Sequence, residues 1–352
     1  NTHTKLCIKI MEAQWRTKWT WNTGFSADSV EWCPIEEFAD IMVCGTYQLK
    51  EDDQSTNAVQ SRIGRIYLFS IKGDNKTEPT QTIETSGILD QKWCQHKINN
   101  APVLATATSI GTIELYQLQN NGQSLRLKLW NETTIGENIL ALSLDWSSNK
   151  CFDNSPSLLV SDSSGSVTLF SLENEKLVKT GVWKLHGFEA WVTAFNYWNT
   201  DIFYSGGDDC LLKTIDKRVP DNAVAVNKSH EAGVTAIRCH TQIEHQIITG
   251  SYDEKVRLFD SRNLKRPVTE IDVKGGVWRL KWNPQRHSTI LSACMYGGFR
   301  ILNLHDNNFS IICEYMEHGS IAYGADWCRN GNVVGTCSFY DCKLNISEVE
   351  FK

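Results

Sequence analysis

Three histidine and aspartate pairs are the first residues of this chain whose types and spacing could do chemistry. The members of each pair are 23 residues apart, in His186 and Asp209, His230 and Asp253, and His318 and Asp341. A histidine held by an aspartate can act as a general base. A catalytic dyad would occur once, however, whereas three copies at one interval indicate a repeated contact. We therefore predict that each pair hydrogen-bonds inside the scaffold and ties one repeat together.

The repeat is visible as short β-type runs that end in an apolar residue, at Leu68, Leu115, Leu169, Ile215, Leu258, Ile301 and Ile346. Their spacing of about 43 to 54 residues is the period of a WD-type propeller blade. A second set recurs once per repeat, at Trp32, Trp93, Trp146, Tyr197, Cys239, Trp282 and Trp327. Polar and apolar residues alternate before this set, which indicates strands. The sequence therefore predicts an all-β, seven-bladed WD-repeat β-propeller in which the second set marks the inner strands.

Two further runs follow in each predicted blade. In the fifth repeat they are residues 246–250 and 255–259, joined by a polar turn that suits a hairpin. The last repeat lacks an outer strand, and we expect the N-terminal segment, residues 1–24, to supply it. Its strand-like stretch from Gln14 to Trp21 would close the ring and remove the exposed edges. Residues 1–352 would then form one domain, with a mobile hydrophilic loop at 50–62 in the first blade.

Composition argues against several classes of function. The formal net charge is −6 and there is no basic cluster, so the footprint of a nucleic-acid-binding protein is absent. The 12 cysteines include no Cys-x-x-Cys pair, and we expect neither a metal nor another cofactor. No apolar run has membrane length and no secretory signal is visible. We expect a cytoplasmic monomer that binds neither nucleic acid nor membrane.

A few residues are not explained by the repeat. Glu189 and Trp191 lie in a loop that is two residues longer than its counterparts in the fifth and seventh repeats. Trp278, Arg279 and Tyr323 occupy strand-start positions that other repeats give to Thr, Ala or Ser. These five side chains are therefore candidates for function.

Three more candidates lie in predicted turns between second and third strands: Asp208, which forms an acidic pair with Asp209, Tyr252 and Tyr340. In a propeller, strand starts and these turns share one face around the channel mouth. Acids, an arginine and aromatic rings that converge there are typical of a ligand pocket. The alternative is that each aromatic residue only packs between blades.

Several sequence blocks, spread from the first blade to the last, are similar to those of the diphthine methyl esterase family. They are Ala27-Asp-Ser-Val-Glu-Trp-Cys-Pro34, Cys44-Gly-Thr-Tyr-Gln48, Phe188-Glu-Ala-Trp191, Ser205-Gly-Gly-Asp-Asp209, Gly250-Ser-Tyr-Asp-Glu254, Gly275-Gly-Val-Trp-Arg279, Tyr323-Gly-Ala-Asp-Trp327 and Cys337-Ser-Phe-Tyr-Asp341. The resemblance implies an ester hydrolase of diphthamide biosynthesis. Its substrate would be methylated diphthine, a modified histidine of translation elongation factor 2.

Ester hydrolysis needs an attacking group, a base and donors for the developing oxyanion. No Gly-x-Ser-x-Gly nucleophile elbow is present, which argues against a standard serine hydrolase. We favour a water molecule activated by Glu189, Asp208 or His186, with Arg279 facing the oxyanion. Ser205, Cys44 and Ser338 are weaker candidates, because each lies at a repeat-like turn or strand end.

The implied substrate carries a quaternary trimethylammonium group, which aromatic ring faces beside a carboxylate can hold. The candidate walls are Trp191, Tyr252, Trp278, Tyr323 and Tyr340, and Asp326 is the candidate counter-charge. The competing class of function is a non-catalytic scaffold or a peptide-signal receptor, because propellers host many unrelated functions.

Overall fold

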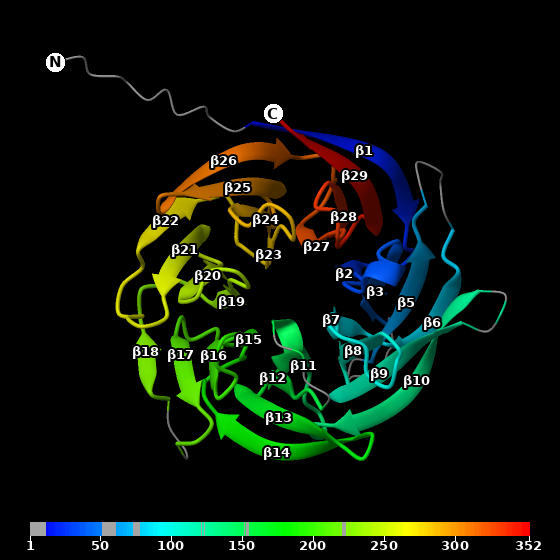
Figure 1. Cartoon of the computed structure of the whole chain (residues 1–352), viewed down its shortest axis with the longest axis horizontal. Coiled ribbons are helices and arrows are strands. Elements are labelled where there is room, and N and C mark those ends of the chain that lie inside the picture. Colours follow the sequence, from blue (N-terminus) through cyan, green and yellow to red (C-terminus); the bar gives the residue numbers. More distant parts are fainter. Residues whose placement is uncertain are drawn as a thin grey trace.

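Seven antiparallel sheets are arranged in a ring, as Figure 1 shows. We call the region that their inner strands surround the central channel. This arrangement is that of a seven-bladed β-propeller, so the predicted fold is confirmed. A computed structural model describes residues 12–50, 61–72, 78–120, 122, 124–150, 152, 155–219 and 223–352. The predicted loop at 50–62 falls largely outside the described residues.

The first four blades follow one another in chain order from the first inner strand. Blade 1 contains β2 (Ala27–Trp32), β3 (Ile41–Thr46), β5 (Arg62–Ser70) and β6 (Gln81–Ser86), with the short β4 (Gln48–Leu49) paired to β5. Blade 2 contains β7 (Ile88–Trp93), β8 (Val103–Thr108), β9 (Thr112–Asn120) and β10 (Leu125–Thr134). Blade 3 contains β11 (Ala141–Trp146), β12 (Leu158–Asp162), β13 (Ser166–Glu173) and β14 (Lys176–Lys184). Blade 4 contains β15 (Val192–Phe195), β16 (Ile202–Gly206), β17 (Leu212–Asp216) and β18 (Ala225–Asn227).

The last three blades complete the circle. Blade 5 contains β19 (Val234–Cys239), β20 (Gln246–Ser251), β21 (Lys255–Asp260) and β22 (Thr269–Asp272). Blade 6 contains β23 (Arg279–Trp282), β24 (Thr289–Ala293), β25 (Phe299–His305) and β26 (Asn308–Tyr315). Blade 7 contains β27 (Ala322–Trp327), β28 (Val333–Ser338), β29 (Lys343–Phe351) and, from the other end of the chain, β1 (Ala13–Asn22).

The closure of the ring joins the two ends of the chain. β1 runs antiparallel to β29, with Ala13 opposite Phe351 and Asn22 opposite Lys343. Figure 1 shows these two strands side by side at the rim. The N-terminal strand therefore supplies the outer strand that the last repeat lacks, as predicted, and pairs the edge that β29 would otherwise expose.

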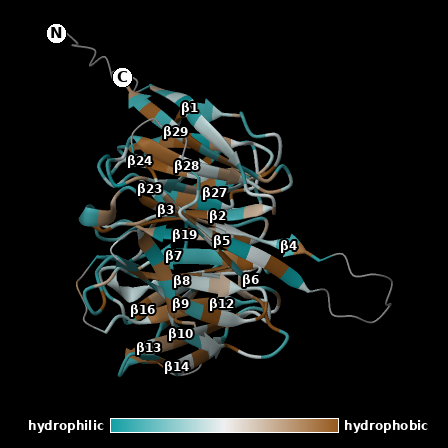
Figure 2. Cartoon of the chain, turned by 90° about the vertical axis from the view of Figure 1, so that its right-hand side faces the viewer, coloured by the Kyte–Doolittle hydropathy of each residue, from teal (hydrophilic) through white to brown (hydrophobic). Residues whose placement is uncertain are grey.

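The core lies between neighbouring blades, where the apolar faces of the sheets meet. Figure 2 shows hydrophobic residues, in brown, along the strands. Trp93, Trp146 and Trp327 each donate a hydrogen bond to the preceding blade. Trp146 is 1% exposed, and its Nε1 donates a hydrogen bond to the Lys92 carbonyl of the preceding blade at 3.0 Å. Trp93 makes the same bond to the Glu31 carbonyl at 3.4 Å. Both side chains combine a large buried area with a satisfied N–H, which explains why an aromatic residue marks most repeats.

Two faces of the ring follow from the strand order. We call top the face at which the inner strands begin and at which the second and third strands are joined; the other face is the bottom. In several inner strands the pairing register shifts by one residue near the top, as in a β-bulge. The extra residue is Asp28 in β2, Leu89 in β7 and Leu142 in β11. Such bulges re-aim one side chain.

Helical structure is limited, in the part of the chain that the structure describes, to two short turns at Glu36–Phe38 and Ser147–Asn149. Both are single 3-10 turns in loops of the bottom face. Within the same residues, no helix has the length and apolar character that crossing a membrane would require.

Candidate functional site

Four aromatic residues predicted from non-repeated positions meet at the top mouth of the channel. The ring of Trp278 lies between its neighbours, with centroids 5.9 Å from Trp191, 6.1 Å from Tyr252 and 4.7 Å from Tyr323. Trp191 and Tyr252 contact each other edge to face at 6.2 Å. All four side chains are half-buried, so each combines packing with an accessible surface. The structure therefore brings together residues from blades 4, 5, 6 and 7.

Two further rings extend this group into blade 1. Phe339 lies 5.1 Å from Tyr323, and Tyr47 lies 5.8 Å from Phe339. We call the set Trp191, Tyr252, Trp278, Tyr323, Phe339 and Tyr47 the aromatic wall. Tyr340 stands outside it: the ring contacts Phe339 at 5.1 Å, but the residue is 71% exposed. Phe339 and Tyr47 were missed in the sequence, although both occupy the turn position of Tyr252.

The predicted acids Glu189 and Asp208 flank one end of the aromatic wall. Trp191 donates from Nε1 to Asp208 Oδ1 at 2.9 Å, and the Asp208 amide donates to the Glu189 carbonyl at 2.9 Å. Burial, with these two carboxylates nearby, raises the pKa of the Tyr252 phenol. Asp208 is exposed and Glu189 half-exposed, so both carboxylates can meet water at the channel mouth.

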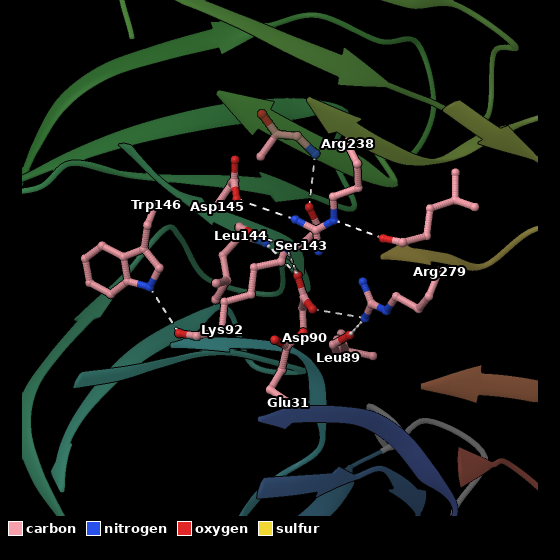
Figure 3. A network of polar contacts seen from close by, with 12 residues as sticks. Glu31, Leu89, Asp90, Lys92, Ser143, Leu144, Asp145, Trp146, Arg238 and Arg279 are labelled. Carbon is pink, nitrogen blue, oxygen red and sulfur yellow. Dashed lines mark hydrogen bonds and ion pairs between the residues drawn. The ribbon is translucent and has the colours of Figure 1, made fainter. Parts of the chain in front are cut away.

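Two buried carboxyl groups lie with Arg279, the residue after Trp278, beside Tyr323 of the aromatic wall. Asp90 is 1% exposed and Asp28 is 3% exposed. Arg279 Nη2 lies 3.0 Å from Asp90 Oδ1 and 4.0 Å from Asp28 Oδ1, and it also donates to the Leu89 carbonyl at 3.2 Å. Figure 3 shows the guanidinium directed at Asp90 and Leu89. The arginine is thus committed to Asp90 and only approaches Asp28.

Because the two carboxyl groups share one cation unequally, their pKa values shift in opposite directions. Burial raises the pKa of Asp28 to about 8; Arg279 opposes the shift and the negative charge of Asp90 adds to it. Burial also opposes ionisation of Asp90, but Arg279 and Lys92 hold the pKa of that carboxyl at about 2. Like charges close together commonly divide in this way, with one group ionised and the other protonated.

Sequence reasoning missed Asp28 and Asp90, although a signal was present. Asp28 lies four residues before Trp32, the same offset that Trp278 and Tyr323 have from the tryptophans of their own blades. The three residues are therefore equivalent positions of blades 1, 6 and 7. Counting back from the repeated tryptophan would have placed Asp28 with the two aromatic residues.

His186 lies in a buried hydrogen-bonded chain in blade 4. Its Nδ1 lies 2.8 Å from Asp209 Oδ1 and its Nε2 lies 3.0 Å from Ser205 Oγ, and the side chain is fully buried. Burial lowers the pKa of this imidazole, against the opposing effect of Asp209. Both ring nitrogens are thus engaged in a buried chain from Asp209 through His186 to Ser205. This contact is the direct pair that the repeat predicted, and the role of His186 as a base stays a prediction.

In the other two predicted pairs, the histidine and the aspartate do not hydrogen-bond to each other. His230 bonds through Nε2 to Thr249 Oγ1 at 2.9 Å, whereas Asp253 forms an ion pair with Arg257 at 2.8 Å. This prediction of a direct pair was wrong, because Arg257 takes the carboxylate that the interval assigned to the histidine.

In blade 7, Ser338 lies between the two partners. His318 Nδ1 is 2.6 Å from Ser338 Oγ, which donates to Asp341 Oδ1 at 2.5 Å. The prediction of a direct hydrogen bond was wrong here too. The repeated interval therefore marks a common location, and its hydrogen bonds differ between blades.

Asp326 lies away from the aromatic wall, towards the bottom of the channel. Its Oδ2 accepts the Trp32 backbone N–H at 2.8 Å, and its Oδ1 lies 3.3 Å from Lys281 Nζ. Both Asp326 and Lys281 line a cavity of about 420 Å³ at the bottom mouth. The assignment of Asp326 as counter-charge at the aromatic residues is therefore corrected. Asp326 directly precedes the repeated Trp327, and this position is near the bottom end of the inner strand β27.

Buried ion pairs connect the two mouths along the channel wall. Lys92 Nζ lies 3.0 Å from Asp90 Oδ2, and Arg238 lies 3.7 Å from Asp145 Oδ1 (Figure 3). Lys281 contacts Glu31 as well as Asp326. These charges have partners from the protein itself, as buried charges require.

Comparison with known proteins gives relatives over most of the chain. The chain is 40% identical over 326 residues to the mouse protein named diphthine methyltransferase, and the aligned region covers 87% of this chain and 68% of the mouse protein. It is 38% identical to the human protein of the same name, over 88% of this chain and 74% of the relative. A Dictyostelium discoideum protein named diphthine methyltransferase homolog is 36% identical, and the aligned region covers 92% of this chain and 96% of that protein.

Two other comparisons concern families and folds. No protein-family model matches the chain. A chain of the crystal structure of the mitotic checkpoint complex superposes with a TM-score of 0.72 over 99% of this chain and 96% of its own length, at 13% sequence identity. At this identity the similarity supports the propeller fold alone.

Proposed function

The chain belongs to the diphthine methyltransferase family of diphthamide biosynthesis, and from this membership we propose that it hydrolyses the methyl ester of methylated diphthine. The substrate would be the modified histidine of translation elongation factor 2, presented to the top face as part of the folded protein. The single observation that carries the proposal is the convergence of the aromatic wall, Arg279 and several carboxyl groups at one channel mouth.

Each part of this site fits one part of the proposed substrate. Aromatic faces attract a quaternary ammonium group, which cannot donate hydrogen bonds. Arg279 has donors beyond those bound to Asp90 and Leu89, and a guanidinium stabilises oxyanions. Glu189 and Asp208 offer carboxylates accessible to water on the same mouth. The combination supports hydrolysis of an ester that lies beside a fixed positive charge.

In the proposed reaction, Glu189 or Asp208 accepts a proton from water as the water oxygen bonds to the ester carbonyl carbon. Negative charge develops on the carbonyl oxygen, which Arg279 faces. The bond from that carbon to the methoxy oxygen then breaks, and the methoxy group leaves as methanol with the proton that the base had accepted. General-base assistance of this kind contributes roughly 10² to 10⁴ in rate.

The relatives' name favours a second candidate, methyl transfer to diphthine. Hydrolysis removes a methylene from the mass of the substrate and consumes water, whereas methyl transfer adds a methylene and requires a methyl donor. A non-catalytic receptor would bind elongation factor 2 and leave its mass unchanged. The mass of the modified peptide therefore distinguishes the three functions: it falls on hydrolysis, rises on methyl transfer and stays unchanged with a receptor.

The test is incubation of the purified chain with methyl-esterified elongation factor 2, followed by the mass of the modified peptide. Parallel reactions contain esterified or unesterified diphthine, with and without a sulfonium methyl donor. Glu189→Gln and Asp208→Asn test the bases, and Asp306→Asn, an acid 85% exposed in a bottom-face turn, is the matched control. Loss of a methylene from the ester without a donor supports hydrolysis; a donor-dependent gain would assign methyl transfer instead.

A further inference from the structure

Asp28 is a buried carboxyl group that shares its nearest cation, Arg279, with Asp90 and is the more distant of the two from it. The residue is 3% exposed, and within the described residues Oδ1, like Asp90 Oδ1, accepts no hydrogen bond. Buried polar groups are generally hydrogen-bonded, and an exception needs an explanation. Here the sequence places the aspartate at a bulge in β2, so the carboxyl group sits where one side chain is re-aimed.

The groups around Asp28 come from four other strands. Asp90 on β7 repels its charge and Arg279 on β23 attracts it, while the Tyr323 phenol on β27 and the Cys337 thiol on β28 are both buried and coupled to it electrostatically. Arg279 is 3.0 Å from Asp90 but 4.0 Å from Asp28, and Lys92 also contacts Asp90. Both nearby cations are thus closer to Asp90 than to Asp28, so a further positive charge near Asp28 would be attracted with less opposition than one near Asp90.

Aromatic rings adjoin this carboxyl group. Tyr323 adjoins both environments: its ring lies 4.7 Å from Trp278, and its strand β27 packs against β2, which carries Asp28. Burial, with the charge of Asp28 nearby, raises the pKa of its phenol. Aromatic faces attract cations through their quadrupole, and more strongly when water is excluded. A negative group behind the rings adds a Coulomb attraction that acts over several ångströms and does not need a hydrogen bond.

We propose that Asp28 and the adjoining rings of Trp278 and Tyr323 form a binding site for a quaternary ammonium group, with Asp28 as its counter-charge. The proposal rests on the proposed function and deepens it, since it assigns the part of the substrate that this side of the mouth holds. It also gives Asp28 the role that the sequence had suggested for Asp326.

Binding at this site is linked to protonation. Burial raises the pKa of Asp28 to about 8, so the free protein holds this carboxyl largely protonated at neutral pH. A cation beside it favours the ionised form, so binding releases a proton. The affinity for the cation therefore increases as the pH rises towards about 8 and then levels off.

The experiment is a calorimetric titration with choline and with 3,3-dimethylbutanol, its neutral carbon isostere. Titration in two buffers of different ionisation enthalpy measures the proton released. We expect the wild-type protein to bind choline but not the isostere, with proton release at neutral pH. Asp28→Asn should weaken choline binding roughly tenfold or more and remove the proton release, and Asp306→Asn should change neither.

Four results would overturn the proposal: no choline binding by the wild-type protein at millimolar concentration, equal binding of choline and the isostere, unchanged binding by Asp28→Asn, or loss of binding in Asp326→Asn instead. A thermal melt of each variant shows whether it is folded. The assay contains no ester, so a failure of the hydrolase proposal with choline still bound, or the reverse, separates the two claims.

Discussion

The two mouths of the channel are both rich in charge, but they use it differently. At the bottom, Lys281 contacts both Glu31 and Asp326, and these residues line a cavity of about 420 Å³. At the top, Arg279 lies 3.0 Å from Asp90 but 4.0 Å from Asp28, so Asp28 has the weaker share of this cation. A buried ion pair that the protein completes by itself serves the structure. An incomplete one beside aromatic rings points to a ligand.

The largest expected effect is on turnover at the top mouth. Glu189→Gln and Asp208→Asn remove the two water-accessible carboxylates, and we expect at least one of them to slow ester hydrolysis by roughly 10² to 10⁴ while the melting temperature changes little. The measurement is initial rate against substrate concentration. Normal turnover by both variants would place the base elsewhere in the molecule.

A comparable loss at the bottom mouth should appear in stability. Lys281→Met leaves Glu31 and Asp326 together without their cation, and breaking a buried pair in this way costs about 3 to 5 kcal/mol. The free energy of unfolding from a denaturant titration checks this value. The double variant Glu31→Gln with Lys281→Met should regain part of the loss, because fewer buried charges are left unpaired.

The same type of measurement should give the opposite sign at Asp28. A carboxyl group with a raised pKa in the folded state stabilises that state least at high pH, because the unfolded chain loses the proton near pH 3.8 and the folded chain only near pH 8. Stability from this group therefore falls as the pH rises from about 4 to about 8. Asp28→Asn should raise the melting temperature, with a gain that grows over this range. A gain independent of pH would show that Asp28 titrates normally.

A smaller effect is expected from the rings. Trp278→Leu keeps an apolar side chain but removes the ring quadrupole, which should weaken binding of a quaternary ammonium ligand by about 0.5 to 2 kcal/mol. A neutral isostere serves as the control ligand in the same titration. An equal loss for both ligands would mean that Trp278 contributes packing alone.

The remaining effects concern scaffold contacts away from the two mouths. Since His186 and Asp209 bond directly, a double-mutant cycle with alanine should give a coupling of about 0.5 to 3 kcal/mol. His230 and Asp253 have separate partners, so their alanine variants should add within about 0.5 kcal/mol. Denaturant titrations of the single and double variants measure both couplings, and a strong coupling of His230 to Asp253 would contradict the contacts described.

Much of the fold could be predicted because it depends on local pattern. A large aromatic residue that packs between blades recurs at the same place in most repeats, and the strand that closes the ring must lie outside the last repeat. The residues of the aromatic wall were visible where they broke the repeat, as at Trp278. Asp28 was not recognised for two reasons. One acid near a strand start fits the ordinary alternation of polar and apolar residues along a strand, and the partner Arg279 lies in another blade.

Other details depend on contacts that spacing does not encode. The interval between His230 and Asp253 is the same as in the other pairs, yet Arg257 takes the carboxylate. Asp326 looked suitable as a counter-charge by type, but its offset from the tryptophan puts it near the bottom. Residue type suggested the chemistry in both cases, and only the position along the strand decided the partner.

The most direct test of the central claim is the reaction of the purified chain with methyl-esterified elongation factor 2 in water labelled with heavy oxygen, without a methyl donor. The account predicts that the modified histidine loses one methylene, that the new carboxylate gains one heavy oxygen, and that the methanol released carries none. An unchanged substrate, or a label found in methanol and not in the carboxylate, would contradict hydrolysis at the carbonyl carbon.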